Sequence, residues 1–413
     1  MRSSGFGLLL SVAMLFSAGS MAGTAEAQDD EVTLVIANSQ WLDALRGERL
    51  WAAVKQYEKV APNVLLEQEA IPSKDYADRL ITEMSAGQGP DLAIVQDGLF
   101  YPIADAGFLI PLDDVVAGAS GLNGTNADGV VKGATLGVAW QRAVYALIYN
   151  KALIEESGAS VPANVDELIE QAKAVSGATG AIGFSTRHSM SEVTNWFKDF
   201  QNWVYGYGGS WVDADGKLVV NSPEAVAATE AFKKVYDAGI IPLGDPMTQQ
   251  RTRFKEGQVA FSIDNSGGTL NIASGGALAS ADMAAAPLPF PHPGAHQQIL
   301  VGVSAHSEHP EEAKAFLEWM LSPEGQQALR DASGPDALAT DVPVTTEFAA
   351  ENPWAPVFAE LAVDSRSTLI PGYEVETAAI MRIVMEAVER VLITGVSAQE
   401  ALDAAQGEIE RKY

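Results

Sequence analysis

Four histidines close together in the sequence are the first residues whose types and spacing could bind a metal. They are His292, His296, His306 and His309, spaced as H-x-x-x-H and H-x-x-H. On a helix, such spacings can place two imidazoles on one face to hold zinc. Prolines on both sides of His292 exclude a helix there, and the second pair lies between a predicted strand and a predicted helix. We therefore expect solvated loop histidines and no metal site.

Sequence motifs for enzymatic chemistry are absent from the chain. It contains no G-x-x-x-x-G-K phosphate loop, no G-x-S-x-G nucleophile elbow and no H-E-x-x-H pair. Residues 213–216 (DADG) begin like a calcium loop but lack its later ligands. Because the chain has 54 acidic residues, a pair of carboxylates indicates little. We expect neither catalysis nor a cofactor, and an exported glycosidase or metal-dependent hydrolase is the alternative from another functional class.

Several tryptophans lie where strands end and loops begin, beside amide side chains. Trp41 follows Gln40, Trp140 comes just before a predicted strand, and Trp196 follows Asn195. In open α/β sheets, ligands bind beyond the carboxyl ends of the strands. An indole packs on the C–H face of a sugar, while amides and carboxylates bind its hydroxyl groups. This pattern predicts a carbohydrate site, with packing in a protein core as the alternative for each indole.

Alternating strands and helices must position these residues. Residues 32–37, 64–68 and 91–95 are short β-rich apolar runs. Between the first two, apolar residues recur with the period of a helix. A β-α-β-α-β order implies parallel strands with right-handed crossovers.

The rest of the chain continues in this style. Residues 143–149 and 259–263 are further predicted strands, Asn164 with Glu167 forms a capping box, and Ser222 before a proline starts another helix. A chain of 413 residues, 47% of them hydrophobic, is expected to form about two domains. The sequence thus predicts an α/β protein of two similar lobes.

The N-terminus and the net charge indicate the compartment and the partners. Arg2 precedes an apolar run, residues 6–16, and an A-E-A triplet follows at residues 25–27, as is typical of a secretory signal peptide. The run is too short to span a bilayer, and a chain without cysteine cannot be anchored through a lipidated cysteine. We expect cleavage after Ala22 or Ala27 and a soluble protein in a bacterial periplasm. The net charge of −28 disfavours nucleic acids and anionic lipid as partners.

Six segments resemble, in their order along the chain, motifs of the extracellular solute-binding proteins of family 1. This is the carbohydrate-type family of the maltose-binding proteins that serve ABC importers. Each motif alone is degenerate, whereas six in the right order are specific. The segments are residues 89–92 (GPDL), 109–114 (LIPLDD), 137–150 (GVAWQRAVYALIYN), 161–168, 254–261 (FKEGQVAF) and 309–326.

The resemblance implies a two-lobed periplasmic-binding-protein fold, type II-like, in which each lobe is a mainly parallel sheet flanked by helices. It implies a signal peptide over 1–27, one lobe from 28–141 plus 300–330, and a second lobe from 142–299 plus 331–413, joined by hinge crossings. It further implies a monomer that closes on a carbohydrate by hinge bending and then docks on ABC permease subunits in the inner membrane.

The resemblance also places the candidate ligand-binding residues at the ends of strands and at the crossings. No Trp follows Asn265 and Gln297-Gln298-Ile299 stands where the family often has Gly-Gly-Trp, which favours a short or polar ligand over a long maltodextrin. An arginine in the site could bind a ligand carboxylate or phosphate, so an anionic sugar derivative or other small polar solute stays the alternative. The candidates are Gln40, Trp41, Gln96, Asp97, Trp140, Arg142, Arg187, Asn195, Trp196, Asp264, Asn265 and Tyr373.

Overall fold

The first three strands of the described part of the chain are parallel, as the sequence predicts. The computed structural model describes residues 31–43 and 46–413, so the predicted signal peptide lies outside the described residues. β1 (Val32–Ala37) pairs in parallel with β2 (Val64–Glu69) and with β3 (Leu92–Gln96). The apolar side chains of β3 are buried on both sides because helices cover both faces of the sheet.

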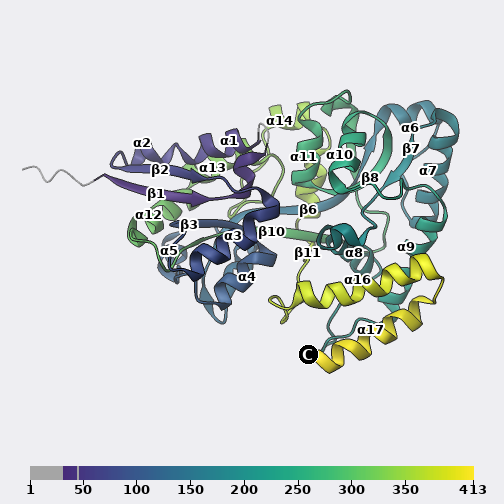
Figure 1. The fold of residues 1–413 in the computed structure, drawn as a ribbon. Coiled ribbons are helices and arrows are strands. Elements are labelled where there is room, and N and C mark those ends of the chain that lie inside the picture. The colour runs from purple at the N-terminus through teal and green to yellow at the C-terminus, as the bar shows by residue number, and fades with distance from the viewer. Residues whose placement is uncertain (1–30, 44–45) are drawn as a thin grey trace, which may run out of the picture.

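Two long strands carry the chain between two lobes (Figure 1). β6 (Val138–Asn150) pairs antiparallel with β10 (Ala295–Val303) along its first half and with β8 (Val259–Asn265) along its second half. β10 also pairs with β3, and β8 pairs in parallel with β7 (Ile182–Ser185). One sheet of order β2-β1-β3-β10-β6-β8-β7 therefore runs through both lobes, with β9 (Met283–Ala286) beside β6 and β11 (Arg366–Ser367) beside β10.

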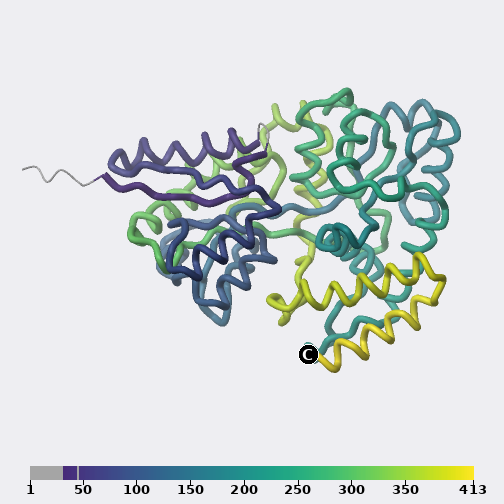
Figure 2. Tube along the Cα trace, viewed as in Figure 1, coloured from purple at the N-terminus to yellow at the C-terminus, as the bar shows by residue number. Residues whose placement is uncertain are grey.

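The helices are divided between the lobes, as the tube in Figure 2 also shows. The chain enters the second lobe along β6, returns along β10, and crosses a third time in residues 334–345, between α13 and α14. The lobe that holds β1 contains α1 (Arg46–Val54), α2 (Tyr57–Val60), α3 (Ser73–Ser85), α4 (Asp97–Asp105), α5 (Asp113–Gly118), α12 (Pro310–Leu321) and α13 (Pro323–Ser333). The lobe that holds β8 contains α6 (Lys151–Ser157), α7 (Val165–Thr179), α8 (Val193–Gly206), α9 (Pro223–Asp237), α10 (Met247–Lys255), α11 (Ser266–Ala273), α14 (Thr346–Glu351), α15 (Ala355–Leu361), α16 (Thr377–Thr394) and α17 (Ala398–Lys412). Short elements complete the chain: β4 (Val130–Val131), β5 (Ala134–Thr135) and the 3-10 helices η1 (Ser39–Leu42), η2 (Gly124–Gly129), η3 (Met190–Glu192) and η4 (Ser280–Asp282).

Each lobe buries apolar side chains on both faces of its part of the sheet. In the first lobe, α1, α12 and α13 cover one face and α3 and α4 the other. In the second lobe, α7, α8, α9, α16 and α17 cover one face, while α10, α11 and α15 cover the other. The helix starts behave as predicted, since Asn164 Oδ1 accepts from the Glu167 N–H at 2.9 Å and Ser222 Oγ accepts from the Ala225 N–H at 3.2 Å.

One of the four clustered histidines differs from the prediction of solvated loop residues. His296 is only 4% exposed, because it belongs to β10, which begins at Ala295. Its Nδ1 lies 2.9 Å from Ser365 Oγ and its Nε2 lies 3.6 Å from the Asp128 carboxylate. His292 is exposed, as predicted.

Residues 31–43 and 46–413 hold neither a metal-binding cluster nor a membrane-spanning helix. No three His, Asp or Glu side chains in these ranges are grouped so that they could hold a metal ion. No helix in these ranges combines the length and the apolar character needed to cross a membrane.

Candidate functional site

Polar side chains from both lobes meet beside the strands that cross between them. At the carboxyl end of β1, Asn38 caps η1 by accepting from the Gln40 N–H at 2.9 Å, and its Nδ2 donates to Gln40 Oε1 at 3.2 Å, which orients the Gln40 side chain. Gln40 donates to Gln141 Oε1 at 3.0 Å and accepts from Trp140 Nε1 at 3.1 Å. Gln141 lies on β6 and is fully buried. The end of β1 is thereby joined to a crossing strand through buried amides.

Arg46 extends this network to the second lobe. Its Nη2 donates to Gln141 Oε1 at 3.0 Å and to Asp336 Oδ2 at 2.9 Å. The other oxygen of Asp336 accepts from the hydroxyl of Ser266, the first residue of α11. Burial raises the pKa of Asp336, and Arg46 opposes that shift. A continuous chain of polar contacts thus runs from the first lobe, through the third crossing segment, to the second lobe.

The carboxyl ends of β7 and β8 carry a buried cluster of charges. Arg187 donates to Asp199 at 3.0 Å and to Asp264 at 3.3 Å, and Arg251 makes a two-pronged contact with Asp264 at 2.7 and 2.8 Å. Burial raises the pKa of Asp199 to about 6, although Arg187 opposes the shift. Burial would also raise the pKa of Asp264, but the two arginines outweigh it and hold this pKa well below its usual range. The cluster is therefore balanced internally, with each guanidinium held by a carboxylate.

A third contact joins the lobes directly. The ammonium of Lys198 on α8 donates to Gln96 Oε1, at the end of β3, at 2.9 Å. The next residue, Asp97, is buried and accepts from the Gly98 N–H at 2.8 Å, the Gln298 N–H at 3.0 Å and the Thr368 hydroxyl at 3.4 Å. We call the side chains of these contacts the interlobe network. It consists of Gln40, Arg46, Gln96, Asp97, Gln141, Lys198, Ser266 and Asp336, together with the neighbouring charge cluster of Arg187, Asp199, Arg251 and Asp264, whose ion pairs all lie within the second lobe.

The rings of the three candidate indoles lie in hydrophobic cores, although Trp140 Nε1 donates to Gln40 of this network. Trp140 and Trp196 are fully buried and Trp41 is 6% exposed. The Trp41 ring packs edge-on against Trp140 at a centroid distance of 6.3 Å, and Trp196 packs on Phe232 at 6.2 Å. This burial fits the alternative of core packing, and stacking of these rings on a sugar stays a prediction.

The remaining sequence candidates are spread more widely. Arg142 donates to Gln298 at 2.8 Å and to Asp128 at 2.6 Å, and as the strand neighbour of Gln141 it points to the other face of β6. Asn265 caps α11 by accepting from the Gly268 N–H at 2.7 Å. Asn195 and Tyr373 are half-buried, and neither side chain has a hydrogen-bond partner among the described residues.

Five of the twelve sequence candidates belong to the interlobe network: Gln40, Gln96, Asp97, Arg187 and Asp264. Sequence reasoning missed Arg46, Gln141, Lys198, Asp199, Arg251, Ser266 and Asp336. One signal was available, because the aromatic segment of α8 carries four polar residues that the fold buries: Lys198, Asp199, Gln201 and Asn202.

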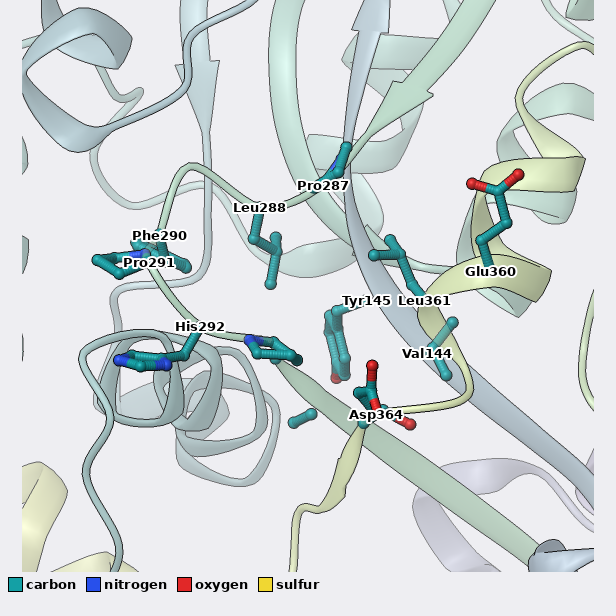
Figure 3. A pocket seen from close by; sticks show the side chains of 14 residues that line it. Val144, Tyr145, Pro287, Leu288, Phe290, Pro291, His292, Glu360, Leu361 and Asp364 are labelled. Atoms are coloured by element: carbon teal, nitrogen blue, oxygen red, sulfur yellow. The ribbon is translucent and has the colours of Figure 1, made fainter.

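Two cavities lie in the second lobe. One of about 250 Å³ lies between the proline-rich loop 287–294, Tyr145 of β6 and Asp364 (Figure 3). Another of about 470 Å³ shares His292, Pro293 and Asp364 with it. Neither is lined by a member of the interlobe network.

Known proteins resemble this chain in sequence and in fold. The model of the family described as bacterial extracellular solute-binding protein matches residues 44–327. A binding protein of Brucella abortus is 26% identical over 268 residues, which are 62% of this chain and 62% of that protein, so the match spans less than two thirds of the relative.

Among solved structures, the GacH receptor of Streptomyces glaucescens, studied unliganded and with acarbose, superposes with a TM-score of 0.81, 22% identity, and coverage of 92% of this chain and 98% of that one. Maltose-bound MalE3 of T. maritima gives a TM-score of 0.78, 22% identity and coverage of 92% and 100%. UgpB of Mycobacterium tuberculosis, in complex with glycerophosphocholine, gives a TM-score of 0.78, 17% identity and coverage of 92% and 97%. These likenesses establish the two-lobed fold.

Proposed function

The chain belongs to the bacterial extracellular solute-binding protein family, and we propose that it binds a neutral carbohydrate or polyol between its lobes for an ABC importer. The observation that carries this proposal is the interlobe network, which is rich in hydrogen-bonding groups yet balanced in charge. Solved proteins of the same fold were studied with acarbose, maltose and ribitol, which agrees with a hydroxylated ligand.

The pairing of the arginines favours a neutral ligand over an anionic one. Arg187 and Arg251 are held by Asp199 and Asp264, and Arg46 is held by Asp336. At these arginines, a carboxylate or phosphate on the ligand would have to displace one of these partners and leave a buried aspartate uncompensated. Lys198 forms no ion pair among the described residues, but the negative charge of Asp97 acts on it and would repel an anion bound there. A hydroxyl group instead both donates and accepts, so it can bind carboxylates, amides and guanidinium groups without changing their charge balance.

Binding in this proposal makes and breaks no covalent bond. A ligand held by groups of both lobes stabilises the arrangement in which the lobes meet, and so shifts an open–closed equilibrium at the crossing strands. A micromolar affinity corresponds to about −8 kcal/mol, which a few charge-assisted hydrogen bonds can supply.

Calorimetric titration with neutral and anionic sugars tests the ligand class. We expect maltose, D-tagatose or ribitol to bind with one site per chain and to raise the melting temperature, while glucose 6-phosphate does not bind. If the protein binds glucose 6-phosphate and none of the neutral sugars, its ligand is an anionic sugar and the proposed ligand class is wrong. Release of products from maltose on long incubation would instead favour a glycosidase.

We also propose that the protein is exported to the periplasm after removal of its signal peptide. Mass spectrometry of the mature protein should find an N-terminus at Gly23 or Gln28, since cleavage is expected after Ala22 or Ala27. An intact Met1 in material from the periplasm would contradict this.

A further inference from the structure

Lys198 is a buried cation with unusually few partners. Its residue is 5% exposed, and its ammonium donates to one acceptor among the described residues, Gln96 Oε1 at 2.9 Å. An ammonium carries three N–H donors, so two remain available. The contact joins α8 of the second lobe to the end of β3 in the first.

The partner of Lys198 is a neutral amide, whereas a buried ammonium is usually paired with a carboxylate. The arginines of the interlobe network are each paired with a carboxylate, whereas Lys198 forms no ion pair within the described part of the chain. Burial lowers the pKa of Lys198, and Asp97 is the group that opposes this shift. Burying an ammonium against one neutral amide is costly. A further acceptor would lower this cost.

Asp97 complements Lys198 from the other lobe. It follows Gln96 directly, and its carboxylate accepts three hydrogen bonds, from Gly98, Gln298 and Thr368. A carboxylate has about four acceptor positions, so one remains. The second lobe therefore contributes an ammonium with two available donors, the first lobe contributes a carboxylate with one available acceptor position, and no ion pair joins the two groups.

We propose that Lys198 is the specificity-determining residue that the second lobe contributes, and that it donates to oxygen atoms of a hydroxylated ligand beside Asp97, which the family resemblance already makes a candidate acceptor for the ligand's O–H groups. This inference rests on the proposed function and adds the residue that reads the ligand's oxygens. A vicinal diol suits this pair, because neighbouring hydroxyls offer two acceptors to the ammonium and a donor to the carboxylate. Since the two groups come from different lobes, such a ligand also favours their closure.

Substitution of Lys198 tests the proposal, with maltose, D-tagatose and ribitol as the probes. Lys198→Met removes the charge and keeps the length of the side chain, and Lys198→Gln keeps polar donors should the first variant fail to fold. Lys151→Met is the matched control, because Lys151 is an exposed lysine of the same lobe. Circular dichroism establishes that each variant is folded before calorimetry is done.

For a probe that the wild type binds, we expect Lys198→Met to lower the affinity at least tenfold and Lys198→Gln to lower it less. Lys151→Met should leave the affinity unchanged. Unchanged affinity in a folded Lys198→Met or Lys198→Gln protein would overturn the role of Lys198 and leave the proposed function standing. Failure of the wild type itself to bind any of the three probes would count against the proposed function, and the inference would fall with it.

Discussion

At the scale of single residues, Asp264 holds the charge cluster of the second lobe together. It is 1% exposed and binds both Arg187 and Arg251. Asp264→Asn removes the charge that balances them, so we expect the free energy of unfolding to fall by about 3 kcal/mol. Chemical denaturation measures this. Asp166→Asn is the control, because the Asp166–Lys234 pair is largely exposed and should contribute at most about 1 kcal/mol; equal effects of the two variants would contradict the prediction.

Asp199 predicts a pH dependence of the opposite sign to that of Asp264. Its folded-state pKa, about 6, lies above the value of about 3.9 expected in the unfolded chain. The folded protein therefore binds this proton more tightly, and its contribution to stability rises as the pH falls from about 6 to about 4. Asp199→Asn removes this titration, so the wild type should gain stability relative to the variant, by on the order of 2 kcal/mol, over that window.

Unfolding at several pH values checks both signs. The pKa of Asp264 is lowered, so its contribution is complete above about pH 4 and is lost only at lower pH. The stability difference between wild type and Asp264→Asn should therefore shrink on acidification below pH 4. A wild-type-minus-Asp199→Asn difference that stays constant between pH 7 and 4 would refute the role given to Asp199.

The indoles and Lys198 show why the candidate site was only partly predictable. The family resemblance placed Gln40, Gln96 and Asp97 at strand ends, and they lie just after β1 and at the end of β3. Whether Trp140 faces a ligand or a core depends on the local register, and β6 is irregular opposite Ile299 and Leu300. Lys198 lies among aromatic residues of α8, which is a sequence signal for a buried polar residue, but its contact with Gln96 of the other lobe depends on the fold.

At the scale of elements, the start of α7 is a local feature that can be tested alone. Asn164 Oδ1 accepts from the Glu167 N–H at 2.9 Å, and Glu167 accepts from the Ala163 N–H at 2.9 Å. Asn164→Ala leaves one of the first helical N–H groups without its acceptor, so we expect a loss of about 1 kcal/mol in the free energy of unfolding. Lys173→Ala, at an exposed position of the same helix, serves as the control in thermal and chemical denaturation, and a loss as large there would rule out the cap as the cause.

The individual strands and helix starts were predictable because their signals are local. Strand β1 coincides with the apolar run 32–37, and α9 begins at Pro223 after the Ser222 cap. The pairing of β10 with both β3 and β6 was not predictable, because it joins residues about 150 to 200 positions apart and has no local signature. The buried position of His296 follows from that pairing.

At the scale of the whole molecule, the lobes meet where Gly267 of α11 lies against Arg46 of α1. A Cβ atom on Gly267 would lie 2.9 Å from Arg46 Nη1, and Arg46 is held in place by Gln141 and Asp336. Alanine could be accommodated by a shift of the arginine tip, but a phenylalanine ring could not. Gly267→Phe should therefore hold the lobes apart.

We expect Gly267→Phe to increase the radius of gyration in small-angle scattering. Because closure is coupled to binding, the variant should also bind the sugars that the wild type binds with at least tenfold lower affinity. The melting temperature of the variant should stay close to that of the wild type, because each lobe keeps its own core. Gly177→Phe is the matched control, since a Cβ at Gly177 on α7 meets nothing within 4 Å. If Gly267→Phe scatters and binds like the wild type, the lobes do not approach each other at α11, and the interlobe network does not link ligand binding to closure.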